Sequence, residues 1–217
     1  MLFSKSFDKI YSMINYPHKK NRQSIEHGLC NDNKKAVDFG RRGMSFEAQI
    51  IKANEYYLAS GLAVIHKKPT PVQIVKVDYP SRSKATITEA YFKTPSTTDF
   101  NGVYKGIYID FEAKETTNKT TFPLANIHVH QVHHIMAVSR QNGFAFLLIK
   151  FSALNEIYLL KSDTLYQFWK EYEKGRRKSI KRAEFINYGI KISNNSYPSV
   201  DYLKVIDQLL KKDGTLK

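Results

Sequence analysis

The segment from Tyr104 to Lys114 constrains this fold most, because its side chains alternate between apolar and polar or charged types. Successive side chains of a β-strand point to opposite faces, so the segment predicts a strand with two unlike faces. One face carries Ile107, Ile109, Phe111 and Ala113, and the other carries Tyr108, Asp110, Glu112 and Lys114. Charged groups are costly to bury unless they are paired. This central strand therefore predicts a functional site on its charged face.

Helix and strand patterns alternate on either side of this strand. Apolar periodicity and turn residues predict helices at about 45–59 and 128–141, and strands at 62–66, 72–77, 86–92, 144–151 and 157–160. Further helices follow, with Asp163 and Ser199 as expected N-caps. The order of helix, strands, helix, strands and helices predicts an α/β fold.

The charge balance indicates a polyanionic partner. The chain has 217 residues, with 34 Lys and Arg against 20 Asp and Glu, and a formal net charge of +14. Such a basic chain most often binds nucleic acid, although a basic protein without that partner has the same composition. The single cysteine, Cys30, excludes an internal disulfide, and we find no secretory signal or membrane-spanning run. We therefore expect a cytoplasmic protein.

We expect two parts in the chain. Residues 1–40 are rich in polar and basic side chains and predict a flexible N-terminal arm. Residues 41–212 predict a single domain that is large enough for a hydrophobic core. Within this domain, two strands joined by the polar, basic segment Asp78–Lys84 predict a long hairpin, at about 68–93, that projects as a stalk.

Asp99, Glu112 and Lys114 are the residue types of a metal-dependent nuclease. Mg²⁺ is usually held by one or two carboxylates, with water and phosphate oxygens completing its shell. Because Lys114 follows Glu112 by two positions, its ammonium shares the face of that carboxylate and could stabilise charge on a phosphate. By spacing alone, an exposed Glu–Lys pair on a strand face explains these residues equally well.

Longer motifs favour the nuclease. They are GMSFE at 43–47, IHKKPTP at 65–71, EAYF at 89–92, TPSTTD at 94–99, YIDFEAKET at 108–116, KT at 119–120, FPL at 122–124, NIH at 126–128, HQ at 130–131 and DYLK at 201–204. Over roughly residues 13–210 the chain resembles the RecU family of Holliday-junction resolvases, in the PD-(D/E)xK nuclease superfamily. The resemblance implies a restriction-endonuclease-like mixed β-sheet flanked by helices, with a projecting β-hairpin stalk.

The resemblance also implies roles for matching residues. One or two Mg²⁺ ions, replaceable by Mn²⁺, would be surrounded by Thr97, Asp99, Glu112 and Gln131, with Lys114 as the transition-state stabiliser. Basic residues expected to contact DNA are Lys67, Lys68, Arg82 and Lys84, with Arg82 on the stalk. Glu47 and Asp110 are candidates for groups that support the metal ligands.

The activity implied is a Mg²⁺-dependent endodeoxyribonuclease that resolves four-way DNA junctions by paired symmetric nicks, leaving 5′-phosphate ends, in recombination and repair. The implied partners are a second copy of the chain and a recombinase such as RecA. Two alternatives stay open: a non-catalytic module that binds junctions or a recombinase, and a general nuclease of linear duplex. A zinc site is a weaker interpretation, since no cysteine or acidic residue accompanies His128, His130, His133 and His134.

Overall fold

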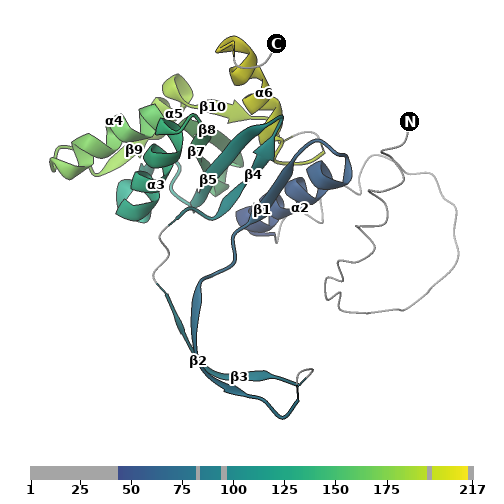
Figure 1. The fold of residues 1–217 in the computed structure, drawn as a ribbon. Helices are drawn as coiled ribbons and strands as arrows, with labels where there is room; N and C mark the ends of the chain where they lie inside the picture. Colours follow the sequence, from purple (N-terminus) through teal and green to yellow (C-terminus); the bar gives the residue numbers. More distant parts are fainter. Residues whose placement is uncertain (1–43, 82–83, 94–96, 195–196, 215–217) are drawn as a thin grey trace, which may run out of the picture. The chain divides into compact units, whose positions relative to one another are not determined.

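A computed structural model describes residues 44–81, 84–93, 97–194 and 197–214. Its main feature is a six-stranded sheet in the order β1-β4-β5-β7-β8-β10 (Figure 1). The strands of this sheet are β1 (Val64–Lys67), β4 (Phe100–Tyr104), β5 (Ile107–Thr116), β7 (Phe144–Phe151), β8 (Glu156–Lys161) and β10 (Ile190–Ile192). Only β5 and β7 pair in parallel, so the sheet is mixed.

Helices and two small sheets complete the described residues. The helices are α2 (Phe46–Ala59), α3 (Val129–Arg140), α4 (Ser162–Glu173), α5 (Arg182–Tyr188) and α6 (Tyr202–Lys212), with short 3₁₀ helices at Leu124–Asn126 and Ser152–Leu154. The two-stranded sheets are β2 (Val72–Asp78) with β3 (Thr86–Phe92), and β6 (Thr121–Pro123) with β9 (Ser179–Lys181). The predicted α/β fold, with a mixed sheet flanked by helices, is confirmed.

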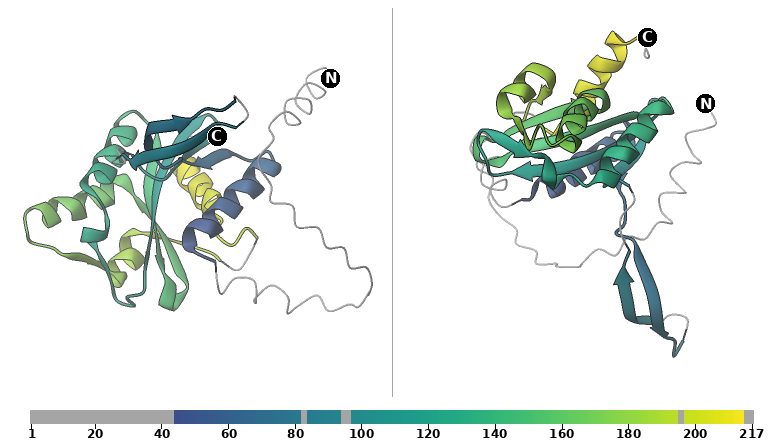
Figure 2. Two further views of the ribbon diagram at one scale, coloured as in Figure 1. Left: turned by 90° about the horizontal axis from the view of Figure 1, so that it is seen from below. Right: turned by 90° about the vertical axis from the view of Figure 1, so that its left-hand side faces the viewer.

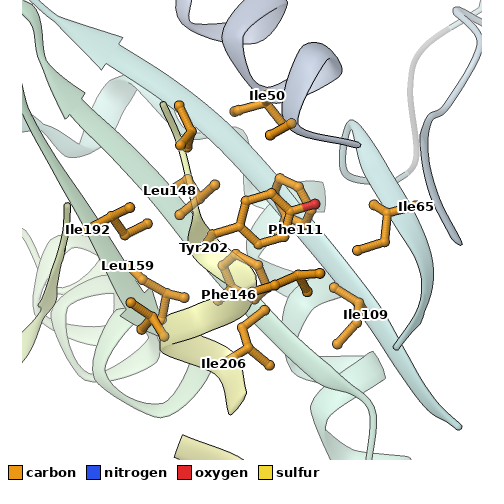
Figure 3. Close-up of a cluster of buried hydrophobic side chains, with 14 of the residues drawn as sticks. Ile50, Ile65, Ile109, Phe111, Phe146, Leu148, Leu159, Ile192, Tyr202 and Ile206 are labelled. Atoms are coloured by element: carbon orange, nitrogen blue, oxygen red, sulfur yellow. The ribbon is translucent and has the colours of Figure 1, made fainter. Parts of the chain in front are cut away.

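Two hydrophobic cores hold helices against opposite faces of the sheet. Helices α2 and α6 pack on one face, around Phe111, Phe146 and Tyr202 (Figure 3). Helices α3, α4 and α5 pack on the other face, against alternate residues of β7 and β8. In the left view of Figure 2, α2 (blue) and α6 (yellow) lie on one side of the sheet and α4 (light green) lies on the other. Strand β5 contacts both α2 and α3.

Strand β5 begins later than the sequence pattern predicted. Tyr104 belongs to β4, and a tight turn at Lys105 and Gly106 separates the two strands. Both turn residues have positive φ angles, 49° and 80°, which suit a two-residue hairpin connection. In the next strand pair, a Cβ on Gly102 would lie 2.0 Å from the carbonyl oxygen of Val64. Glycine at this position therefore allows β1 and β4 to approach.

The ends of the helices follow their local chemistry. The Ser45 hydroxyl accepts a hydrogen bond from the Ala48 N–H at 3.2 Å and caps α2 as predicted. The two other predicted caps are wrong. Asp163 lies in the first turn of α4, whose N-cap is Lys161, and α6 is capped by Asp201 instead of Ser199.

The β2–β3 hairpin is present, with Val72 opposite Phe92 and Asp78 opposite Thr86. Every residue in both strands is exposed, including several large apolar side chains. Projection of this hairpin as a stalk stays a prediction. The predicted N-terminal arm lies outside the described residues. Among the helices that the structure describes, none combines the length and apolarity needed to cross a bilayer.

Candidate active site

The two carboxylates singled out in the sequence meet where β4 begins beside β5. Phe100 is opposite Phe111 in the antiparallel register, so Asp99 lies beside Glu112. The backbone N–H of Asp99 donates a hydrogen bond to Glu112 Oε2 at 3.1 Å. Glu112 is fully buried, whereas Asp99 is half-buried. One carboxylate is therefore fixed within the sheet and the other lies at its accessible margin.

Lys114 completes this group. Its ammonium lies 2.8 Å from Glu112 Oε1, and its side chain is 21% exposed. The geometry is that of an ion pair without an aligned hydrogen bond, since Oε1 has no hydrogen-bond partner among the described residues. Burial raises the pKa of Glu112 from 4.5 to about 7, Lys114 opposes this rise, and the adjacent Asp99 adds to it. Lys114 therefore only partly compensates the negative charge of the buried Glu112 carboxylate.

Asp110 is also fully buried on the same face of β5 and gathers polar groups around it. Its Oδ2 accepts hydrogen bonds from the Lys68 ammonium at 2.8 Å and the Tyr108 hydroxyl at 2.9 Å. His134 Nε2 lies 3.2 Å from the same oxygen, and the Thr98 hydroxyl donates to Oδ1. The sequence pattern placed Asp110 on this face but gave no indication that Thr98 and His134 would contact it.

The other two predicted ligands lie in different settings. Thr97 is half-buried just before Asp99, and its hydroxyl donates to the Thr98 carbonyl at 3.3 Å. Gln131 is 5% exposed in the first turn of α3. Its Oε1 accepts the His128 N–H at 3.0 Å in a capping box. This bond fixes the amide of Gln131 and leaves its oxygen one further lone pair.

His130 belongs to the histidine cluster for which the sequence left a zinc site as the weaker interpretation. Its Nε2 atom is buried and has no hydrogen-bond partner among the described residues. Burial lowers the pKa of His130, and His128 and Lys114 lower it further. The rings of His128 and His130 stack with centroids 5.4 Å apart. The charge of Lys114 therefore acts on a buried ring nitrogen that no described residue satisfies.

Of the basic residues expected to contact DNA, Lys67 and Lys68 have different partners. Lys67 and Lys68 are consecutive on an extended segment and therefore point to opposite faces. Lys67 pairs with Glu47 of α2 at 2.6 Å, whereas Lys68 reaches Asp110. Lys84 is exposed in the β2–β3 connection. Arg82 lies outside the described residues.

The residues present fit Mg²⁺ better than zinc. Asp99 and Glu112 offer oxygen ligands, and the under-compensated charge of buried Glu112 would favour a bound cation. No group of three or more His, Cys, Asp or Glu side chains within the described ranges is arranged to hold a metal. A two-carboxylate site, with water and phosphate filling the remaining positions, requires no such group.

Comparisons with known proteins match most of the chain to one family. The sequence model of the family Recombination protein U (RecU) matches residues 41–208. The chain is 54% identical to Holliday junction resolvase RecU of Staphylococcus carnosus over 200 residues, covering 91% of this chain and 96% of the relative. It is 52% identical to the protein of that name from Lactococcus lactis over 211 residues, covering 91% and 98%. A Bacillus thuringiensis relative of the same name is 50% identical over 194 residues, covering 89% and 96%.

Proposed function

Because this chain belongs to the RecU family, we propose that it is a Mg²⁺-dependent endodeoxyribonuclease that resolves four-way DNA junctions. The observation that carries the proposal is the meeting of Asp99, Glu112 and Lys114 at one margin of the sheet, in a chain that aligns with named resolvases over about nine-tenths of its length. Action on genomic DNA would place the protein in the cytoplasm of a bacterial cell.

The site residues would divide into metal ligands and one transition-state stabiliser. Asp99 and Glu112 would hold Mg²⁺, with Thr97 and Gln131 at its periphery. A bound Mg²⁺ supplies Lewis-acid chemistry: it stabilises charge on phosphate oxygens and makes water more acidic. The Lys114 ammonium, already held by Glu112, would donate hydrogen bonds to the phosphate as negative charge grows on it.

The proposed reaction is hydrolysis of one phosphodiester bond in each of two strands. A water oxygen attacks phosphorus in line with the 3′ oxygen, the bond from phosphorus to that 3′ oxygen breaks, and a proton passes to the leaving oxygen. The products are a 5′-phosphate and a 3′-hydroxyl. These ends are matched in chemistry, so a ligase can seal them.

A second copy of the chain would supply the second cut. A four-way junction is nearly two-fold symmetric, so a symmetric homodimer places two active sites on equivalent strands. The β2–β3 hairpin is a candidate contact surface, because a two-stranded hairpin alone is marginally stable in water. Its exposed apolar side chains, among them Ile74, Tyr91 and Phe92, would gain stability from a covering partner or DNA. A recombinase partner stays a prediction.

The decisive experiment compares a four-way junction with a linear duplex of the same sequence, each with and without Mg²⁺. Metal-dependent paired nicking of the junction alone is the expected result. Equal cutting of both substrates would indicate a general nuclease. Tight junction binding without cutting, unchanged by Asp99→Ala, would indicate a binding module.

Two variants separate catalysis from recognition. Lys114→Ala should preserve junction binding and abolish cleavage, and a loss of binding would assign Lys114 a structural role. Deletion of Asp78–Lys84 should reduce the preference for junctions while leaving the circular dichroism spectrum unchanged. A misfolded deletion protein would argue against an independent, DNA-facing hairpin.

A further inference from the structure

Two hydrogen bonds hold the backbone of Asp99, and a third holds the residue before it. The Lys68 N–H donates a hydrogen bond to the Asp99 carbonyl at 2.7 Å. The Asp99 N–H donates to Glu112 Oε2 at 3.1 Å. The preceding residue, Thr98, is 2% exposed and donates its hydroxyl to buried Asp110. We therefore expect the position of the Asp99 carboxylate to depend on Lys68, Glu112 and Thr98.

Lys68 takes part in this arrangement twice. Besides its backbone bond to Asp99, its ammonium donates to Thr98 Oγ1 at 3.1 Å and to Asp110 Oδ2 at 2.8 Å. Its side chain is only 19% exposed. An ammonium has three N–H donors, so two of them are already directed into the protein. Lys68 therefore has limited capacity for a phosphate contact.

The same contacts join the two ends of the β2–β3 hairpin. Lys68 precedes β2, and Thr98 follows β3. Both contact Asp110, which lies on β5 two residues before Glu112. The segments that enter and leave the hairpin are thus held together directly beside the two carboxylates.

We propose that Lys68, Thr98 and Asp110 form a positioning network that holds the Asp99 carboxylate in place for the metal ion. This inference rests on the proposed function and departs from the sequence prediction that Lys68 binds DNA. Replacing a residue that supports metal ligands typically lowers metal affinity or activity about 10- to 100-fold. Loss of the network should weaken metal binding by that factor and leave junction binding unchanged.

Two variants test the network. The double variant Lys68→Met with Asp110→Asn removes both charges together, so no buried charge is left without its partner. Thr98→Val removes only the hydroxyl and preserves the shape of the side chain. Lys161→Met is the matched control, because it breaks a Lys–Asp pair with Asp213 in which both side chains are well exposed.

Metal binding is measured without DNA by titrating the full-length protein with Mn²⁺ and following the free ion by electron paramagnetic resonance. Junction binding is measured separately in EDTA by fluorescence anisotropy. We expect the double variant and Thr98→Val to bind Mn²⁺ about 10- to 100-fold more weakly, with junction affinity and its salt dependence as in the wild type. Lys68→Arg, which keeps the charge and donors, should bind Mn²⁺ more tightly than the double variant.

Three results would overturn the positioning role. The first is wild-type Mn²⁺ affinity in the variants. The second is a double variant that loses junction affinity in EDTA with a shallower salt dependence, which would make Lys68 a phosphate contact. The third is a double variant that fails to fold while Thr98→Val folds and binds Mn²⁺ normally. A wild-type protein that binds Mn²⁺ but cuts no junction would refute the proposed function and still leave the network testable.

Discussion

Replacement of Glu112 by glutamine should stabilise the metal-free protein at alkaline pH. Glu112 is fully buried, and burial raises its pKa from 4.5 to about 7 despite the ion pair with Lys114. Below pH 4.5 the carboxyl is protonated in both the folded and the unfolded chain and imposes no cost. As pH rises from 4.5 to 7, the unfolded chain ionises first, so the folded state loses stability. Above pH 7 the full cost is present.

The size of the effect follows from the same values. The difference between a pKa of 7 and one of 4.5 corresponds to about 3 kcal/mol at most. This pKa already includes the favourable effect of the Lys114 ion pair, so that pair requires no separate correction. Glu112→Gln should therefore raise the free energy of unfolding by up to about 3 kcal/mol at pH 8 and by almost nothing at pH 4.

Urea denaturation in EDTA at several pH values measures this difference. The matched control is Glu55→Gln, the same chemical change on an exposed position of α2, which should alter stability little at either pH. Added Mg²⁺ should stabilise the wild type at pH 8 and not Glu112→Gln, because a ligand stabilises only the protein that binds it. A variant that is no more stable than the wild type at pH 8, or equally stabilised at both pH values, would refute the reasoning.

Three further predictions concern the fold. Gly102→Ala should lower the free energy of unfolding by about 3 kcal/mol, because its Cβ would lie 2.0 Å from a backbone oxygen of β1; an unchanged urea midpoint would contradict this. Phe111→Ala should cost about 3–5 kcal/mol in the same assay, because the ring is fully buried and stacked between two others; a loss below about 1 kcal/mol would argue against that packing. Hydrogen bonds from Arg182 lower the pKa of Glu156 to about 2, against the effect of burial, so Glu156 stabilises the fold above pH 4.5 and loses that effect as pH falls towards 2. The stability difference between wild type and Glu156→Gln should close over this range, and a difference independent of pH would contradict the assignment.

Strong apolar periodicity predicted the long helices and strands well. Strands with a weak sequence pattern were not predicted. The β7 and β3 boundaries match the sequence prediction because continuous or alternating apolar residues fill both strands. Strand β4 was not predicted, since Asn101 and Gly102 have low strand propensity and the pairing with β1 depends on a close backbone approach. The three-residue strand β10 carries too few side chains for a pattern to emerge and is defined by its pairing with β8.

By itself, the sequence determined which residue types could perform the chemistry. The alternation in β5 placed Asp110, Glu112 and Lys114 on one face, and the longer motifs identified the family. Only the tertiary structure decided how those groups are used, because burial and contact depend on segments distant in the chain. In the folded chain, Glu112 is buried beside Asp99, and Lys67 and Lys68 point to opposite faces. Polar groups from several elements surround Asp110. A pattern with period two records the direction of a side chain, whereas its neighbours across the sheet are set by strand register.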